Sequence, residues 1–242
     1  MSSHFVGPLG AMMPMCVSVG VGLETGRPRG ELVTTGGVRW AQQARRAPRS
    51  WSVGRLWQEP SWARMLNYAA QGIIKECYLY DVAVARQNML RSSECVGSGA
   101  SVLVDGVPMG ALATGAGPRA YLLAGRTVVV SCWTSAIPGA GVLSFTHAGK
   151  TITLTAPPGT GARYAYAVYT PMSEGVLTTN ITGVISGLRV HEGSPDRSFQ
   201  VTQGTPCLVE VVDPSESLQL VVDGQTRIDY QVTLNEVGQP TF

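Results

Sequence analysis

Residues 142–158, with the sequence VLSFTHAGKTITLTAPP, decide the fold class of this chain. Apolar and hydroxyl side chains alternate from Val142 to Thr146 and again from Thr151 to Thr155, which is the period of half-buried β-strands. Gly149-Lys150 lies between the two runs, and Pro157-Pro158 ends the second. The pattern predicts a β-hairpin.

Similar short runs recur on both sides of this hairpin, at intervals of about 8 to 15 residues, as in β-sandwiches. The chain contains 29 Gly and 15 Pro, which punctuate these runs as turns do. We therefore expect a mainly β protein in which residues 95–242 form a jelly-roll-like β-sandwich. The other expected strands are Ser101–Val104, Thr127–Thr134, Tyr164–Thr170, Val176–Thr182, Cys207–Val212, Leu218–Val222 and Ile228–Leu234.

The N-terminal part differs, because it contains the one helical pattern. Between Pro60 and Gly72, apolar residues recur at steps of three and four, with Pro in the first turn and Gly where the helix should stop. A strand-like run, Cys77–Val82, follows. We predict a separate β module with one short helix over residues 1–94. The Ser- and Gly-rich stretch Leu90–Ser101 is its predicted boundary, with a loop inside one larger domain as the alternative.

The amino-acid composition limits the classes of partner that we expect for this chain. There are 18 Lys and Arg against 16 Asp and Glu, a net charge of +2, which predicts no binding to nucleic acid. No apolar run approaches the roughly 18 to 20 residues of a membrane span, and the apolar start lacks the basic residues of a signal peptide, so no membrane partner is expected. The five cysteines form no C-x-x-C pair, which indicates free thiols made in a reducing compartment.

The sequence contains no complete catalytic or cofactor motif. Gly149-Lys150-Thr151 ends like a phosphate-binding loop, but its flanks alternate as strands, whereas such a loop must open a helix. The three histidines, His4, His147 and His191, are far apart in the sequence and fit no metal-binding spacing. We predict no enzymatic activity, no cofactor and no metal, while a site assembled from distant acids stays open.

Tryptophan and arginine concentrate before and at the start of the predicted helix. Four of the five Trp lie between residues 40 and 62, and Trp with Arg is enriched at the centres of protein interfaces. We predict Trp57, Trp62, Arg45 and Arg46 as interface residues, with Trp51 as the inward residue of a strand. A solvated face for the arginines and a core position for the tryptophans are the alternatives.

Two further sets of side chains are candidates for contacts. Met12, Met13 and Met15 lie in an apolar start without clear period, which we interpret as an arm packed on a neighbouring subunit, with a core strand as the alternative. In Arg163–Tyr169, alternation puts Tyr164 and Tyr166 on one strand face and Tyr169 on the other. These tyrosines are candidate glycan contacts, with core packing as the alternative.

The order of elements in the first 90 residues resembles one family. Phe5-Val6-Gly7-Pro8-Leu9-Gly10 comes first, then Arg49-Ser50-Trp51, the predicted helix, Tyr78-Leu79-Tyr80-Asp81 and Asn88-Met89-Leu90. This order is similar to that of minor tail or distal-tail-like proteins of siphophages that infect actinobacteria. Those proteins often have Pro after the Asp, where this chain has Val82. The second half resembles, more loosely, the carbohydrate-binding-module-like sandwiches that such proteins append.

The resemblance implies a structural virion protein, a tail-tip subunit that is made in the bacterial host cytoplasm. It also implies a homo-oligomer, a hexameric ring at the end of the tail tube, that contacts other virion proteins. The sandwich would then be a spacer or would bind a host cell-surface glycan. Two alternatives stay open: an auxiliary capsid protein that decorates or cements the phage head, or a host-glycan-binding adhesin.

Overall fold

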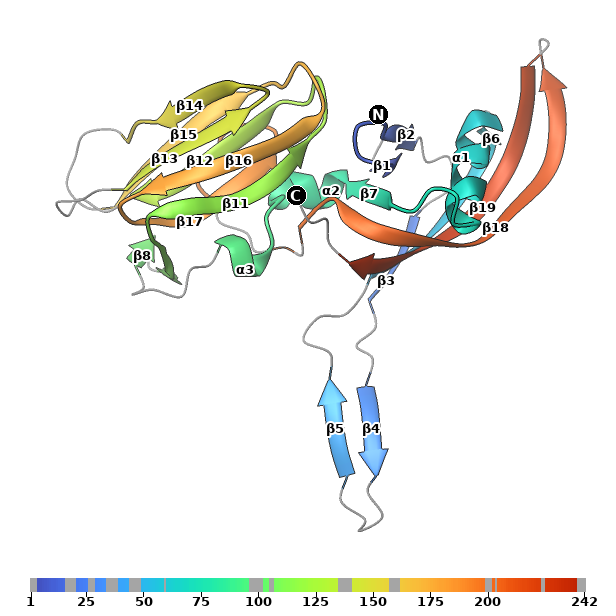
Figure 1. The fold of residues 1–242 in the computed structure, drawn as a ribbon, viewed down its shortest axis with the longest axis horizontal. Helices are drawn as coiled ribbons and strands as arrows, with labels where there is room; N and C mark the ends of the chain where they lie inside the picture. Colours follow the sequence, from blue (N-terminus) through green and yellow to red (C-terminus); the bar gives the residue numbers. More distant parts are fainter. Residues whose placement is uncertain are drawn as a thin grey trace. The chain divides into compact units, whose positions relative to one another are not determined.

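A computed structural model describes most of the chain. The described residues are 4–15, 21–25, 29–33, 39–43, 49–58, 60–95, 102–104, 107–134, 141–156, 162–198, 202, 204–222 and 225–238. The protein is mainly β, with antiparallel sheets, as the sequence predicts. It divides into two compact units (Figure 1). One, here called the sheet unit, combines the described residues up to Leu79 with those from Cys207 onward; the other, the jelly-roll unit, spans Tyr80–Pro206.

The sheet unit is built on one curled, seven-stranded sheet that wraps part of the way round a core, as a half-barrel does. The longest strands form its last hairpin, which pairs with strands from the start of the chain on both sides. In spatial order the strands are β2 (Met13–Met15), β1 (His4–Gly7), β7 (Cys77–Asp81), β18 (Cys207–Val222), β19 (Gln225–Gly238), β6 (Arg49–Gln58) and β3 (Val21–Thr25).

Helix α1 (Pro60–Ala70) closes the core of this sheet, as the apolar stripe of its sequence predicts. Trp62 and Leu66 are buried in one cluster with Trp51 of β6 and Tyr230 of β19. After Ala70 the chain turns at Gly72, whose positive φ of 72° suits glycine at a helix end. The predicted helix over residues 60–72 is therefore confirmed.

Two short hairpins belong neither to the seven-stranded sheet nor to the two sheets of the jelly-roll unit. β4 (Arg29–Val33) pairs with β5 (Arg39–Gln43), and β8 (Val102–Val104) pairs with β9 (Val107–Met109). Each pair forms a sheet of its own, and no third described strand joins either of them.

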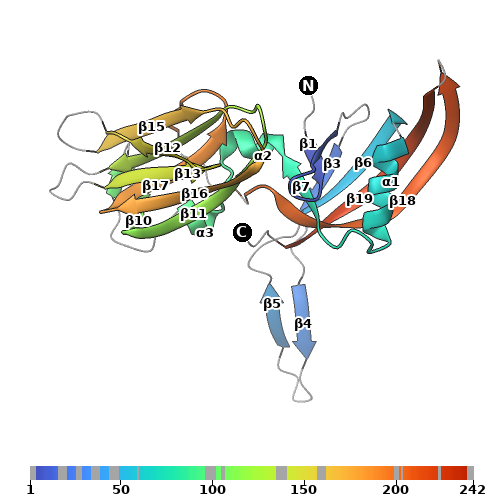
Figure 2. The ribbon, with the colours of Figure 1, turned by 45° about the horizontal axis from the view of Figure 1, so that its top comes forward.

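The jelly-roll unit stacks two four-stranded sheets (Figures 1 and 2). From β10 to β17 consecutive strands lie in different sheets, except for the hairpin β13–β14, and this order is that of a jelly roll. The sequence predicts such a jelly-roll-like sandwich. One sheet has the order β10 (Ala111–Leu112), β17 (Ile185–Glu192), β12 (Val128–Thr134), β15 (Arg163–Tyr169). The other has the order β11 (Gly115–Leu122), β16 (Gly175–Thr182), β13 (Val142–His147), β14 (Lys150–Leu154).

The hairpin predicted from residues 142–158 is β13 and β14, with Thr146 opposite Thr151. Its two turn residues, Ala148 and Gly149, both have positive φ, of 48° and 78°, which matches the twist of the flanking strands. Helices α2 (Val82–Gln87) and α3 (Ser92–Cys95) precede the first strand of the unit. Asp81 caps α2, since its carboxylate accepts hydrogen bonds from the backbone N–H of Ala83 and Val84.

The division into units differs from the predicted boundary between residues 94 and 95. The first unit ends at Leu79, and the helices α2 and α3 belong to the jelly roll. The strands from Cys207 onward, predicted as the end of the sandwich, instead complete the sheet of the first unit. The reason is pairing: β18 bonds to β7 and β19 bonds to β6, so the C-terminal hairpin fills the centre of a sheet begun at the N-terminus.

Candidate functional site

The best candidate for a binding surface lies on β15, an edge strand of the jelly roll. Tyr164 and Tyr166 share one face of this strand by the two-residue period of β-structure, and their rings stack with centroids 5.7 Å apart at 27°. Tyr166 is 50% exposed, and so is Val168, two residues further on the same face. We call Tyr164 and Tyr166 the tyrosine platform.

The platform rests on β12. Trp133 lies directly opposite Tyr164 in the strand register, and the two ring centroids are 5.3 Å apart. The Tyr164 hydroxyl donates a 2.7 Å hydrogen bond to the backbone carbonyl of Asp196. The inner ring is thus held on two sides, and it supports the exposed ring of Tyr166.

Asp196 adjoins the platform through its backbone carbonyl, which bonds the Tyr164 hydroxyl, and its side chain is 52% exposed. Hydrogen bonds from the Ser198 hydroxyl and the Ser198 backbone N–H, with a further contribution from Arg189, lower the pKa of Asp196 to about 2. Asp196 is therefore ionised at neutral pH. Arg189 itself is buried and also donates to the carbonyls of Gln87 and Ser198, so its charge is engaged inside the unit.

Tyr169 lies on the opposite face of β15 from the tyrosine platform. Its ring packs against Phe145 and His147 of the facing sheet, at 5.8 and 5.6 Å between centroids, and its hydroxyl lies 3.0 Å from His147 Nδ1. Lys150 Nζ lies 5.8 Å from the centroid of the same ring. The structure thus brings together Tyr164 and Tyr166, and it makes Tyr169 part of the contact between the two sheets.

A polar cluster inside the jelly roll surrounds the Glu192 carboxylate of β17. Arg126 forms a two-point ion pair with the Glu192 carboxylate, which also accepts a 2.7 Å hydrogen bond from the Tyr80 hydroxyl. Burial and the neighbouring Glu192 carboxylate raise the pKa of Tyr80. Tyr80 is 0% and Glu192 6% exposed, so both are closed to a substrate, and only Arg126 reaches the surface, with 26% of its side chain exposed.

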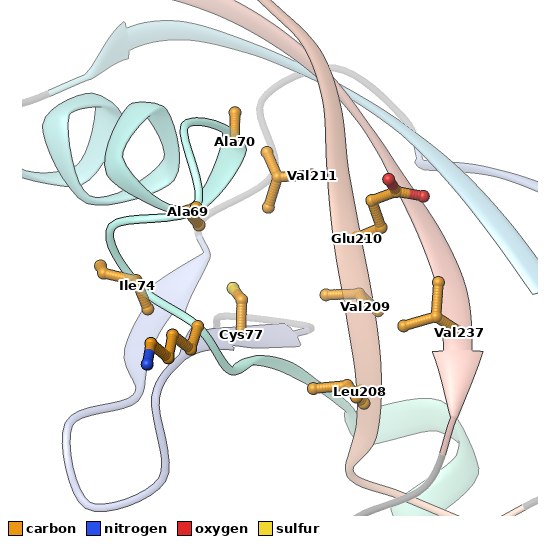
Figure 3. A pocket seen from close by; sticks show the side chains of 11 residues that line it. Ala69, Ala70, Ile74, Cys77, Leu208, Val209, Glu210, Val211 and Val237 are labelled. Atoms are coloured by element: carbon orange, nitrogen blue, oxygen red, sulfur yellow. The ribbon is translucent and has the colours of Figure 1, made fainter.

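The sheet unit contains a pocket of about 410 Å³ between the end of α1 and β18 (Figure 3). Ala69 and Ala70 line it from the helix, and Val209 and Val211 from the strand. Burial raises the pKa of the pocket's Cys77 to about 12, so its thiol stays protonated at neutral pH and is a poor nucleophile. The pocket is therefore a small hollow lined by aliphatic side chains together with Lys75 and Glu210, without an activated thiol.

Known proteins do not identify the chain. No protein-family model and no curated protein matches it. Within the described residues, no group of His, Cys, Asp or Glu is arranged to hold a metal ion, and no helix is long and apolar enough to cross a membrane. Any function must therefore be inferred from the surfaces of the chain itself.

The structure corrects the predicted contact role of Trp62. This side chain is 3% exposed and packs edge-on against Tyr230 of β19, at 5.2 Å and 85°. It is a core residue, because the apolar stripe of a single helix must face the one sheet it covers. The side chain of Trp57, and all of Arg45 and Arg46, lie outside the described residues.

The methionine-rich start is also largely core. Met15 is 0% and Met12 7% exposed, and Met13 packs partly buried against the same cluster. Residues 4–7 and 13–15 pair as β1 and β2 at one side of the curled sheet, so this segment is the core strand that was the alternative to an arm.

Sequence reasoning missed two members of the candidate site, Trp133 and Asp196. The expected strand Thr127–Thr134 contains Trp133, but the position of Trp133 under Tyr164 depends on the pairing of β12 with β15. Asp196 lies in an irregular segment after β17, where no periodic pattern signals proximity to a strand. Only the folded backbone brings these residues to the tyrosines.

Proposed function

We propose that this protein is a structural subunit that works by assembling with copies of itself and with other virion proteins, at the tail tip of a tailed phage. The observation that supports assembly is the β4–β5 hairpin, a two-stranded sheet that no third described strand joins. The tail location rests on the resemblance of the first 90 residues alone. No catalytic step is part of the proposal.

An isolated two-stranded hairpin is at best marginally stable in water, because it buries too little apolar surface. In the register of this hairpin Leu32 is paired with Trp40, so its strands carry large apolar residues at a directly opposed pair. Both arguments favour a hairpin that gains stability when it packs on another subunit. In this proposal Trp40 takes the place of Trp62 as an interface residue, and Trp57 stays a predicted one.

The edges of the curled sheet support the same role. At one edge, β2 contains Pro14, which cannot donate a backbone hydrogen bond and so discourages a further strand. The opposite edge, β3, has the sequence VGLET and contains no proline. Strand addition at β3, next in the chain to the β4–β5 hairpin, is therefore compatible with contact between copies.

The test of assembly is Trp40→Ala, compared with Trp40→Phe and with the control Thr151→Ala on the exposed face of β14. We expect the wild type to sediment as an oligomer and Trp40→Ala to weaken association by at least about thirtyfold, the effect of a lost interface aromatic. Melting temperatures should stay nearly equal. A wild type that remains monomeric and never enters virions, or a Trp40→Ala variant that assembles normally, contradicts the proposal.

Location is tested separately, with a tagged copy detected on virions by negative-stain microscopy. Label at the distal end of the tail supports the tail-tip role. A regular pattern on the head supports instead an auxiliary capsid protein, the alternative that also works by assembly. Turnover of a glycan or of peptidoglycan by the purified protein, lost on changing one acidic residue, would contradict the non-enzymatic part.

A further inference from the structure

The two outer faces of the jelly roll differ in chemistry. The outer face of the sheet that contains β13, β14 and β16 carries mainly hydroxyl side chains, with Thr146 between Thr151 and Thr178 in adjacent strands, and one exposed apolar residue, Val142, at the start of β13. The outer face at β15 instead presents the half-exposed Tyr166 and Val168. Both sheets belong to one unit, so the polar face shows that this fold can expose a sheet face covered by polar side chains. The exposed aromatic and apolar side chains at β15 therefore indicate a binding surface.

The exposed ring is held in a fixed orientation. Tyr166 stacks on Tyr164, and Tyr164 is restrained by Trp133 and by its hydrogen bond to the Asp196 carbonyl. A tyrosine has only two side-chain torsions, and a ring restrained in the free protein loses little entropy when a ligand covers it. The platform is thus ready to receive a flat, partly apolar group.

The size of the surface argues against a protein partner. A stable protein interface buries about 800 Å² on each side, far more than two half-exposed side chains can supply. A sugar ring, in contrast, matches one aromatic face. Its C–H groups cover the ring, and its hydroxyls need hydrogen-bond partners at the rim.

The rim supplies such a partner at Asp196, whose backbone carbonyl accepts the Tyr164 hydrogen bond and whose ionised carboxylate is half-exposed. Arg189, the cation that contacts Asp196, is 4% exposed and so is not available to an anionic ligand. Arg197 is exposed, and among the described residues no hydrogen bond or ion pair joins it to the platform. The charge held next to the rings is therefore negative, which favours a neutral or amine-bearing sugar over a phosphate or uronic-acid polymer.

We propose that the tyrosine platform binds a neutral or amino-sugar polysaccharide, with one pyranose ring stacked on Tyr166 and its hydroxyls donating to the Asp196 carboxylate. The inference is independent of the assembly proposed above, since the β4–β5 hairpin and the platform belong to different units. Of the three tyrosines predicted as glycan contacts, this proposal keeps Tyr164 and Tyr166 and leaves out Tyr169. It adds Asp196 as a further candidate residue.

The test uses the full chain on an array of neutral, amino-sugar and acidic oligosaccharides, followed by titration calorimetry with the best neutral or amino-sugar binder. Tyr166→Ala should lower its affinity at least about tenfold, whereas Tyr166→Phe, which keeps the ring, should bind nearly as the wild type does. Asp196→Asn should weaken binding of this sugar and reduce the discrimination against acidic oligosaccharides, because it removes the negative charge beside the rings. Thr151→Ala, on the opposite outer face, should have no effect.

Three results would overturn the inference. They are a wild type that binds no saccharide on the array, a wild type that binds only acidic ones, and binding that is the same in Tyr166→Ala as in the wild type. Since Tyr166 is half-exposed, its removal should leave the unit folded. If Tyr166→Ala fails to fold, Tyr166→Ser and Asp196→Asn are measured in its place. Saccharide binding that is unchanged in both variants would also overturn the inference.

Discussion

Replacement of Trp62 by alanine separates a core role from a contact role. The side chain is almost fully buried, next to Leu66 on α1 and edge-on to Tyr230. Removing a buried tryptophan costs about 3–5 kcal/mol of folding free energy, which includes the cavity left behind. Spread over a unit of this size, the loss corresponds to a melting temperature lower by roughly 10–20 °C.

Scanning calorimetry of the full chain is the assay. Because the chain has two compact units, we expect two transitions, and Trp62→Ala should lower only the one that belongs to the sheet unit. The control is Val237→Ala in the same unit, where a side chain 57% exposed should change stability by no more than about 0.5 kcal/mol. A Trp62→Ala variant that melts as the wild type does but assembles poorly would refute the core assignment.

Three further predictions concern charge and burial. Burial lowers the pKa of His147 and His191, so below about pH 6.5 the unfolded chain binds protons there that the folded chain does not. The jelly-roll unit should therefore be most stable above about pH 6.5 and lose stability as the pH falls below that value. Thermal melts from pH 8 to 5 measure this loss, and a melting temperature that does not change with pH would contradict the prediction. Arg49→Met leaves the buried Glu236, 3.1 Å from Arg49 Nε, without this cation, and should cost the sheet unit about 3–5 kcal/mol in denaturant unfolding. Burial raises the pKa of Cys132 to about 12, so a thiol reagent at pH 8 should modify it only after denaturant is added.

Local patterns in the sequence were sufficient for several elements. The hairpin at residues 142–154 follows from two alternating runs around Gly149, and α1 from an apolar stripe between Pro60 and Gly72. Both depend on contacts between residues close in the chain, so the period and the turn residues alone specify them. The mainly β class and a jelly-roll-like sandwich were predicted for the same reason, from the spacing of many short strands.

The partner of a strand is not encoded in its own period, and there the sequence was insufficient. The strands Cys207–Val222 and Gln225–Gly238 look like any sandwich strands, yet they pair with β7 and β6, which precede them by more than a hundred residues. Trp62 was ambiguous for a related reason. A tryptophan on a helical stripe suits an interface as well as a core, and its role depends on whether the chain itself provides a sheet to cover it.

The candidate site shows the same division. Alternation by itself placed Tyr164 and Tyr166 on one side of their strand and Tyr169 on the other, because successive side chains of a strand must point to opposite faces. Which of these faces is buried depends on the layer that packs against it. Only the tertiary structure decided that Tyr169 meets the second sheet while Tyr166 stays half-exposed, and only the return of the chain after β17 brought Asp196 beside them.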